Sequence, residues 1–421
     1  DLHLSLRRQR QMCIRDRYII LPSTWSRVRF GEIAKIKVGF SFQSLDFQQD
    51  GVPLIRIGDI ADGTVKFTEK TVFLPSEFLH KYKEFVITKN DIVIALSGSI
   101  GKSGIYKMEF PALLNQRVGK LECLSPQVAY ERYIFYVINS RWFLSFIIAN
   151  ACKSAQGNIS PETIESILIP LPPLPEQKKI AEILGDVDEA IEKVEKIIEK
   201  TERIKKGLMR ELLTRGTGHK EFKKTEIGTI PKEWKVVRLG DTLEMCQYGL
   251  SVKMFDEGKY PIIKMDNICE GYVVPTNLKY VNLDRRTFEA FKLEKGDILF
   301  NRTNSYELVG RTGIFLLDGE YVFASYLLRL RVHQHLLDPH FLTYYLYFVQ
   351  NKLKQLASIA VHQANINATN LQNLKLPLPP LAEQKKIAEI LSTVDKRLEL
   401  LREKKERLRR IKKGLMNDLL T

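Results

Sequence analysis

The sequence has few cysteines, and they are not placed for cysteine chemistry. Among 421 residues there are five, with no Cys-x-x-Cys pair, at Cys13, Cys123, Cys152, Cys246 and Cys269. This spacing excludes a zinc ribbon and a thioredoxin-type redox site, and it argues against a disulfide framework. We therefore expect a reduced, cytoplasmic setting.

Long apolar runs are also missing. The most apolar stretch, 134–148, is interrupted by Asn139 and Arg141, so no segment reaches the 18 residues of a membrane-spanning helix. The first 17 residues are basic but lack the apolar core of a signal peptide. They match nothing else in the chain, and we interpret residues 1–17 as a leader or an artefact. The sequence predicts no membrane association.

Catalytic and metal-binding motifs are lacking as well. The segment 98–103, Gly-Ser-Ile-Gly-Lys-Ser, resembles a phosphate-binding loop but is two residues short between its glycines. His333, His335 and His340 could bind a metal, but no cysteine or acidic ligand set accompanies them. There is no Gly-x-Ser-x-Gly and no dinucleotide-binding fingerprint. We predict no catalytic centre, no metal and no cofactor.

Positive charge, by contrast, is abundant. Lysine and arginine number 65 against 50 acidic residues, a formal net charge of +15. Hydrophobic residues make up 44% and charged residues 27%, which is typical of a folded protein and excludes wholesale disorder. The surplus favours a polyanionic partner, with nucleic acid first and an acidic membrane second.

The chain also repeats itself. Residues 170–184 and 377–391 are identical at fourteen of fifteen positions, at an offset of 207. Residues 204–214 recur as 411–421 at the same offset. Upstream of each constant segment lies a variable region, 22–169 and 231–376, with weaker likeness between the two. Short β-rich runs, such as 53–57 and 91–96, and one helix near 129–149 or 339–357 predict an α+β fold for each region.

The constant segments read as long helices. Apolar residues recur at alternating steps of four and three from Ile180 and from Ile387, the period of a coiled-coil seam, with Lys405 on the second seam. Pro175 suits the first helix start, and Gly216 suits its end. Gly207 and Gly414 lie inside the helices, where we expect close helix–helix approach to offset their cost.

Two such helices are expected to pair, because a single one cannot bury its seam. The second variable region follows the end of helix one and precedes the start of helix two, which favours an antiparallel pair. The predicted fold class is therefore α+β, with two similar domains separated by a long antiparallel two-helix coiled coil and related by a pseudo-twofold axis.

Polar and basic residues cluster at the apparent strand ends of both variable regions. Arg, Asn and Gln can bond a base edge bidentately, whereas Lys and Ser more often hold phosphate. For any one residue, a solvated loop position is the plainer interpretation, but the clustering recurs in both regions. The predicted DNA-binding residues are Arg56, Lys102, Gln116, Arg117, Gln156, Asn158, Lys264, Asn301, Arg302, Asn304, Arg311, Arg329, Gln363 and Asn365, near Ser97, Asn115 and His362.

Three features carry a family resemblance: the duplicated Leu-Pro-Pro-Leu-x-Glu-Gln-Lys-Lys-Ile-Ala segment, the preceding Asn-Ile pairs and the Ile-Pro-x-x-Trp entry to the second region. In these features the chain resembles the specificity subunit of type I restriction-modification enzymes. The resemblance covers nearly all of the chain after residue 17. It implies two target-recognition domains that each read half of a bipartite double-stranded DNA site. It also implies a non-catalytic subunit that docks two methyltransferase subunits, to which motor-nuclease subunits are added.

The resemblance divides the chain into a first recognition domain, 18–170, a spacer, 171–215, a linker with the second recognition domain, 216–376, and a second spacer, 377–421. The helical spacer is expected to set the half-site separation. Asn115-Gln116 fits a pair typical of the family, whereas the second domain has Ser325-Tyr326 there. The residues expected to form the spacer and to bind methyltransferase are Glu176, Gln177, Ile180, Leu184, Glu383, Gln384, Ile387 and Leu391.

Two other functions remain open from the residues alone. A structural tether between two partners would explain the helices but not the basic surplus or the diverged repeated regions. An enzyme would require a catalytic constellation, and the sequence shows none.

Overall fold

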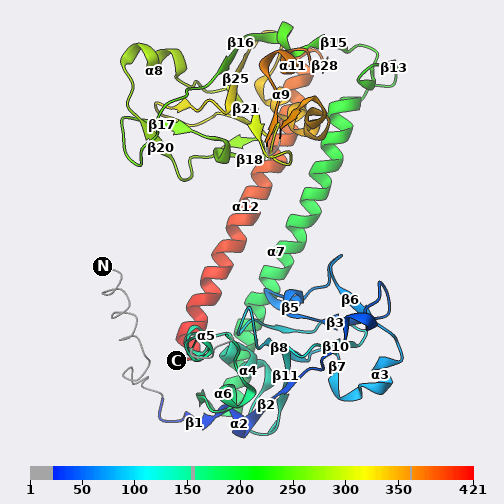
Figure 1. Ribbon diagram of the computed structural model, residues 1–421, viewed down its shortest axis with the longest axis vertical. Coiled ribbons are helices and arrows are strands. Elements are labelled where there is room, and N and C mark those ends of the chain that lie inside the picture. Colours follow the sequence, from blue (N-terminus) through cyan, green and yellow to red (C-terminus); the bar gives the residue numbers. More distant parts are fainter. Residues whose placement is uncertain (1–21, 153–156, 361–362) are drawn as a thin grey trace. The chain divides into compact units, whose positions relative to one another are not determined.

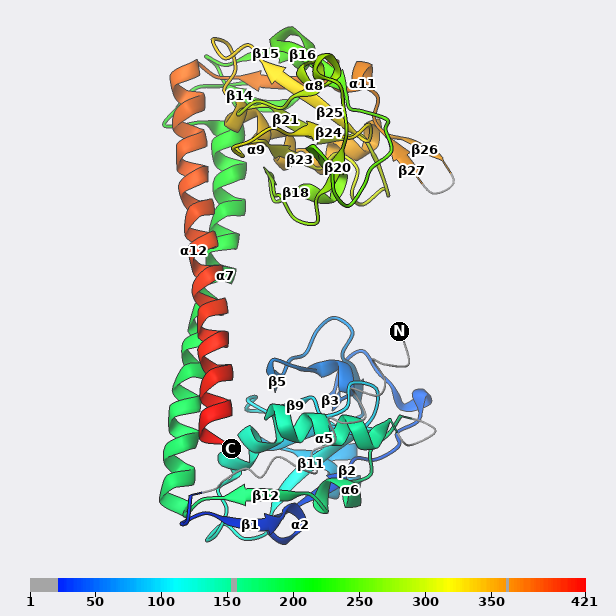
Figure 2. The same cartoon turned by 90° about the vertical axis from the view of Figure 1, so that its left-hand side faces the viewer.

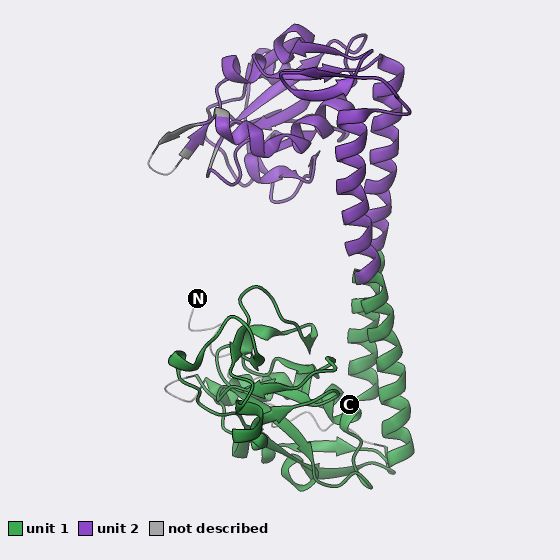
Figure 3. Ribbon diagram, turned by 90° about the vertical axis from the view of Figure 1, so that its right-hand side faces the viewer, with its two compact units in different colours: residues 1–195, 404–421 green, residues 196–403 purple. Residues whose placement is uncertain are grey.

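The computed structural model describes residues 22–152, 157–360 and 363–421. It forms two compact units. Unit 1 comprises residues up to 195 together with 404–421, and unit 2 comprises residues 196–403 (Figure 3). Each unit therefore combines one variable region with a section of both constant segments.

Unit 1 is built on two small sheets. A six-stranded sheet has the order β2 (Ala34–Val38), β11 (Val118–Cys123), β8 (Ile92–Ala95), β9 (Ser103–Ile105), β5 (Gly63–Val65) and β4 (Ile60–Ala61). A four-stranded sheet has the order β6 (Val72–Leu74), β3 (Val52–Ile55), β10 (Ala112–Leu114) and β7 (Val86–Ile87). The predicted strands near residues 53 and 91 are thus β3 and β8, and every residue of both is buried.

Helices pack against the larger sheet. The single helix predicted near 129–149 is two helices, α4 (Glu131–Ile138) and α5 (Arg141–Ala151), bent by 60°. The break occurs because the Ser140 hydroxyl accepts a hydrogen bond from the Phe143 N–H and so starts a new helix. A short α6 (Pro161–Glu165) follows, and β1 (Ser26–Arg29) pairs with β12 (Leu168–Leu171) beside the start of the long helix.

Unit 2 repeats this plan. Its large sheet has the order β16 (Leu243–Tyr248), β25 (Leu327–Val332), β21 (Ile298–Asn301), β23 (Thr312–Ile314), β19 (Tyr272–Val273) and β18 (Ile268–Cys269). Its smaller sheet has the order β20 (Lys279–Val281), β17 (Tyr260–Ile263) and β24 (Val322–Phe323). The helices are α8 (Arg285–Phe291), α9 (Pro339–Phe348), α10 (Gln350–Leu353) and α11 (Ala368–Gln372).

Three further β elements belong to unit 2. The strand β15 (Lys235–Arg238) pairs with β28 (Lys375–Leu378), as β1 does with β12 in unit 1. A hairpin of β13 (Phe222–Thr225) and β14 (Gly228–Pro231) precedes the variable region. A small sheet joins β22 (Thr303–Asn304), β27 (Gln363–Asn365) and β26 (Ser358–Ala360).

Each constant segment forms one long helix, α7 (Leu174–Arg215) and α12 (Leu381–Leu419), and the two lie side by side within each unit (Figures 1 and 2). In unit 1, Lys405 bonds Glu195 at 2.8 Å and Lys412 bonds Asp188 at 2.6 Å. In unit 2, Arg402 bonds Glu202 at 2.8 Å. Residue numbers rise in one helix as they fall in the other, which confirms the antiparallel pairing.

The helix boundaries follow the sequence signals. The helix α7 begins beside Pro175 and ends before Gly216, which has a φ of +69°. Ile180 and Leu184 belong to the core of unit 1 together with Leu420, and Ile387 and Leu391 belong to the main core of unit 2. Lys405 lies on the seam as predicted, where its charge is paired with Glu195 from the facing helix.

The expected close helix approach at the two helical glycines is wrong. A Cβ added at Gly207 or at Gly414 would meet no other atom of the described chain within 4 Å. Neither glycine therefore offsets its conformational cost through packing within this chain.

We expect Gly207→Ala and Gly414→Ala each to raise the free energy of unfolding by about 1 kcal/mol, because alanine restricts the unfolded chain and fits the open helix surface. Urea denaturation of the free chain measures the change. Gly216→Ala is the matched control and should destabilise, because Gly216 has a positive φ and its Cβ would lie 2.6 Å from the Trp234 ring. A loss of stability in either helical variant would contradict the prediction.

Within the residues described, no single helix is long and apolar enough to span a membrane; by length and composition, only the bent pair of α4 and α5 passes such a test.

Candidate nucleic-acid interface

Backbone hydrogen bonds gather several predicted DNA-binding residues at one edge of unit 1. The Leu96 N–H donates to the Arg117 carbonyl at 3.0 Å, and the Leu96 carbonyl accepts from the Ile159 N–H at 3.0 Å, directly after Asn158. The Ala95 N–H donates to the Lys102 carbonyl at 2.8 Å. We call this group, with Arg56 and Gln116, the unit 1 edge.

Unit 2 makes the same bonds with different residues. The Arg302 N–H donates to the Tyr326 carbonyl at 3.1 Å, and the Arg302 carbonyl accepts from the Ile366 N–H at 2.8 Å, directly after Asn365. The Asn301 N–H donates to the Arg311 carbonyl at 2.7 Å. We call this group, with Lys264, the unit 2 edge. The pattern places Arg302, Tyr326 and Arg311 where unit 1 has Leu96, Arg117 and Lys102.

Most of the described unit 1 candidates are open to solvent. Lys102, Gln116, Arg117 and Asn158 are exposed. Arg56 is half-buried, and its guanidinium donates to the Lys70 carbonyl at 2.5 Å. Four of these five residues can therefore meet a ligand without a change in the fold.

The unit 2 edge is more aromatic than the sequence analysis predicted. Arg311 is exposed, and Lys264 is paired with Asp266 at 3.0 Å. The Arg302 guanidinium lies over the Tyr248 ring at 4.9 Å, and its backbone bond to Tyr326 brings a second tyrosine to the edge. Tyr248 and Tyr326 are each 44% exposed. Residue type pointed only to polar and basic side chains, so it missed both tyrosines. The backbone bonds align Asn115-Gln116 with Ala324-Ser325, one residue earlier than the expected Ser325-Tyr326, and they align Tyr326 with Arg117.

Further candidates lie in or beside the parts of the chain that the structure does not describe. Gln156 and His362 lie outside the described residues, and the side chains of Asn304 and Gln363 do too. The backbone of Asn304 pairs with Ala364 in the small sheet, and that of Gln363 pairs with Ala360. Asn365 is half-buried opposite Thr303.

Two other candidates are buried within unit 2, and their contact with DNA stays a prediction. Asn301 is fully buried at the end of β21. Arg329 is 2% exposed, and its guanidinium donates to the carbonyls of Lys292 at 2.6 Å and Ala290 at 3.0 Å and also bonds Gln247. Burial lowers the pKa of Arg329, and the nearby Asp297 carboxylate opposes that shift.

Arg329 has a structural counterpart in unit 1. Lys120, on β11, bonds Asp91 at 2.8 Å, and Arg329, on β25, lies 3.9 Å from Asp297. Both acids precede the central strand of the large sheet, β8 or β21. The basic residue at this position therefore compensates a carboxylate that is buried in unit 2 and half-buried in unit 1.

The two glutamines of the constant segments are also buried and bond groups of this chain, and their role in docking methyltransferase stays a prediction. The Gln177 amide donates to the carbonyls of Val128 and Pro172 at 2.8 Å each and accepts from the Tyr130 N–H at 2.8 Å. Gln384 makes the matching bonds to Leu336, Pro379 and Asp338, at 3.0, 2.8 and 2.8 Å. Each glutamine therefore fastens a long helix to its variable region, and neither has any exposed surface.

The glutamates beside them differ between the copies. The Glu383 carboxylate accepts from the Thr217 N–H at 2.8 Å and from the Trp234 indole at 2.9 Å, and it bonds His219 at 2.8 Å. Burial would raise the pKa of Glu383, but these hydrogen bonds outweigh it and hold that pKa below its usual value. Glu176 is exposed. Of the eight residues expected to bind methyltransferase, Glu176 alone presents an open side chain.

Two of the three histidines considered as metal ligands lie near acidic residues. His333 and His335 line a cavity of about 360 Å³ with Glu244, Glu294 and Asp297. Over the ranges the structure covers, no group of three or more His, Cys, Asp or Glu is arranged to hold a metal ion.

Comparison with known proteins agrees with this twofold construction. The family described as type I restriction modification DNA specificity domain matches residues 22–203 and again residues 231–410. The chain is 32% identical over 420 residues to the type I restriction enzyme MjaVIII specificity subunit of Methanocaldococcus jannaschii, covering 95% of this chain and 93% of the relative. It is 30% identical over 390 residues to the EcoBI specificity subunit of Escherichia coli, covering 87% and 78%.

Solved structures show the same fold. The S subunit of a type I restriction-modification system from M. genitalium matches with a TM-score of 0.58 at 16% identity, covering 94% of this chain and 96% of that one. A chain from a study of complex assembly in the type I system matches with a TM-score of 0.54 at 18% identity, covering 95% and 98%. Two matched domains and full-length relatives together establish that this chain belongs to the family of type I restriction-modification specificity subunits.

Proposed function

We propose that this chain is the sequence-specific DNA-binding subunit of a type I restriction-modification system. Residues 18–170 and 216–376 act as its recognition domains, and each reads one half of a bipartite site. The helical spacer sets the separation of the two half-sites and docks methyltransferase subunits. The exposed side chains on the two edges supply the contacts to DNA.

One observation carries this proposal: the chain builds the same edge twice and gives it different side chains. Leu96 in unit 1 corresponds to Arg302 in unit 2, Arg117 to Tyr326, and Lys102 to Arg311, all through matching backbone bonds. A structural tether has no reason to vary these positions on a constant scaffold. Unequal edges indicate unequal half-sites and therefore an asymmetric target.

The exposed side chains suit such reading. Lys102, Arg117 and Arg311 can hold phosphate and release counterions, which gives a salt-dependent grip without sequence preference. Gln116 and the arginines can also bond base edges, where each good bidentate pair discriminates by about 1–3 kcal/mol. Tyr248 and Tyr326 add flat apolar surface for contact with bases or sugars.

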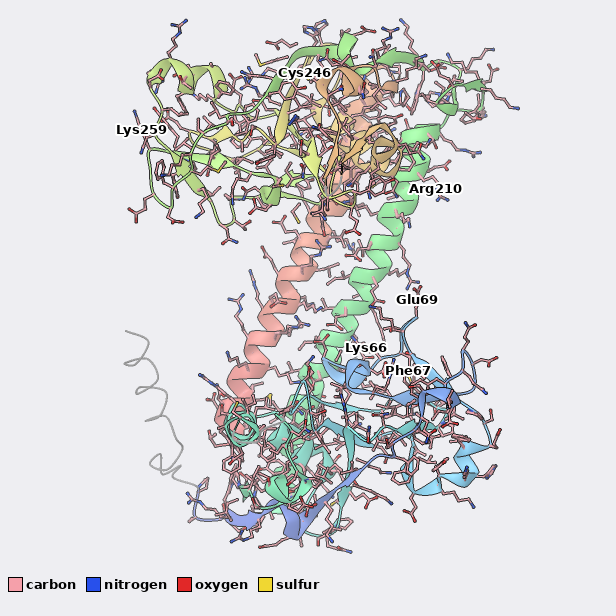
Figure 4. The ribbon with its side chains drawn as sticks, in the orientation of Figure 1. Lys66, Phe67, Glu69, Arg210, Cys246 and Lys259 are labelled. Carbon is pink, nitrogen blue, oxygen red and sulfur yellow. The ribbon has the colours of Figure 1, made fainter. Side chains whose placement is uncertain are left out.

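The partners follow from the family. We infer that the chain works as a non-catalytic cytoplasmic subunit with two methyltransferase subunits, and that motor-nuclease subunits join through that complex. The exposed Glu176 and the exposed faces of α7 and α12, rather than the buried glutamines, are the surfaces available for docking. Arg210, for example, projects from α7 into solvent (Figure 4).

Domain exchange tests the proposal. Residues 231–376 are replaced by the corresponding region of another family member, and the methylated motif of the complex is mapped by sequencing. We expect one half-site to change and the other to stay. The matched exchange of residues 22–169 should change the opposite half. A change in both half-sites after either exchange would contradict modular reading.

The same experiment separates the other functions. A tether predicts no DNA sequence preference even when methyltransferase is present. Methylation or cleavage by the isolated chain would favour an enzyme over a binding subunit.

A further inference from the structure

In unit 2, one carboxylate joins three elements. Asp395, on α12, accepts a hydrogen bond from the Tyr344 hydroxyl at 2.8 Å and pairs with the Lys205 ammonium at 2.5 Å. Tyr344 belongs to α9 of the variable region, and Lys205 belongs to α7. The side chains of Asp395 and Lys205 are each 12% exposed. Both long helices and the variable region therefore meet at a single, largely buried acid.

Unit 1 contains the same arrangement with the two long helices exchanged. Asp188, on α7, accepts from the Tyr136 hydroxyl of α4 at 3.0 Å and pairs with Lys412 of α12 at 2.6 Å. Asp188 and Asp395 are separated by the repeat offset of 207, as are Lys205 and Lys412. Lys412 also lies over the Tyr136 ring at 5.6 Å, whereas Lys205 lies over the ring of Tyr347, which is not the tyrosine that bonds Asp395, at 5.6 Å. We call the two groups the Asp188 triad and the Asp395 triad.

The carboxylate of each triad can hold the elements around it in a defined orientation. An ionised carboxylate is an acceptor with directional lone pairs, and bonds from two sides restrict both the rotation and the sliding of the elements that supply them. Apolar packing of a helix against a helix pair is less directional. Burial raises the pKa of Tyr136 and that of Tyr344, so both remain neutral hydroxyl donors near neutral pH.

We propose that the Asp188 and Asp395 triads are positioning sites that fix each recognition domain on the paired helices and thereby limit the spacer length that the protein accepts between half-sites. This inference rests on the proposed function. Successive base pairs are about 3.4 Å apart along B-DNA, so a rotation that moves a reading edge by a few ångströms changes the register by a whole base pair.

The two triads are not equally restrained. In unit 2 the Tyr272 hydroxyl adds bonds to Asp395 at 3.2 Å and to Tyr344 at 3.0 Å. In unit 1 the position on the equivalent strand is Thr64, whose hydroxyl donates to the Ile105 carbonyl at 3.2 Å instead. The Asp188 side chain is also more exposed, at 35%. Removing the Asp395 triad should therefore loosen the second recognition domain on the paired helices more than removing the Asp188 triad loosens the first.

The test uses the full chain assembled with its methyltransferase subunits. The bipartite motif of the wild-type complex is mapped first, and a DNA library then carries those half-sites with spacers varied one base pair at a time. Tyr344→Phe removes the hydroxyl bond to Asp395, and Asp395→Asn removes the charge that pairs with Lys205. For each variant we expect methylation at spacers one base pair longer or shorter to rise by about tenfold relative to the wild-type length, an effect of the size of one hydrogen bond to a charged group. The half-site sequences should stay unchanged.

Matched variants keep the test specific. Tyr345→Phe removes a buried hydroxyl from the next position of α9 and leaves the Asp395 triad intact, so its spacer preference should equal that of the wild type. For unit 1, Tyr136→Phe is compared with Tyr133→Phe, which loses a buried bond to the Pro170 carbonyl but not the triad. A smaller shift is expected for Tyr136→Phe than for Tyr344→Phe.

The outcomes are separable. An unchanged spacer preference in an assembled Tyr344→Phe complex would overturn the inference while leaving the proposed function standing. Altered half-site bases would do the same, because they would show a reading role rather than a positioning role. If the wild-type complex recognises no bipartite site, the proposed function itself fails and the inference with it.

Discussion

Replacing Asp297 by alanine is expected to lower the free energy of unfolding by about 3–5 kcal/mol, because two arginines then lose a buried counter-charge. Asp297 is 1% exposed and bonds Arg331 through both carboxylate oxygens, at 2.7 and 2.9 Å, and Arg329 lies 3.9 Å away. The pKa of Arg331 is raised chiefly by that hydrogen bond to Asp297. Urea denaturation measures the change.

Asp91→Ala is the matched control in unit 1. Asp91 and its partner Lys120 are about one-fifth exposed, at 19% and 22%, so water compensates part of the lost pair. We expect a cost of about 1–2 kcal/mol there. Equal costs for Asp297→Ala and Asp91→Ala would show that burial does not decide the strength of this repeated ion pair.

Replacing Gln384 by leucine is expected to cost about 3–5 kcal/mol, since two carbonyls and one N–H lose their partner in a buried site. Leucine fills a similar volume, so the loss measures hydrogen bonding rather than a cavity. The carbonyls are those of Leu336 and Pro379, and the N–H is that of Asp338. Thermal or urea denaturation of the free chain gives the result.

Gln177→Leu should cost a similar amount, because Gln177 makes the same three bonds in unit 1. Lys178→Leu, at the exposed neighbouring position, serves as control and should change stability by less than about 0.5 kcal/mol. A docking role for the glutamines alone would give the opposite result, with little loss of stability in the free chain and weaker binding of methyltransferase.

The helical part of the fold could be predicted because its signals are local. A seam period of 3.5 residues, a proline at the start and a glycine at the end are sufficient to define α7, and the chain order favoured the antiparallel pairing that Lys412 and Asp188 confirm. The glycine interpretation failed because propensity indicates a cost at Gly207 but cannot say what lies beside it. Only contacts between distant segments answer that question.

The candidate interface was predicted less completely. Residue type identified exposed candidates such as Lys102 and Arg311, but it cannot separate an open arginine from Arg329, which is surrounded by carbonyls from another part of unit 2. It also passed over Tyr248 and Tyr326, because only polar and basic side chains were considered as candidates. Burial depends on sheet order, and sheet order is not a local property.

The family, the twofold repeat, the helix pair and the basic character can be read from the linear chain, because identity, spacing and charge do not depend on folding. Which polar residues are internal becomes known only from the folded chain. Folding placed Gln177 and Gln384 at the junctions of helix and variable region, paired Arg329 with a buried acid, and brought Tyr344, Asp395 and Lys205 together from three separate elements. The physical reason is that hydrogen bonds and ion pairs between distant segments exist only after the chain has folded.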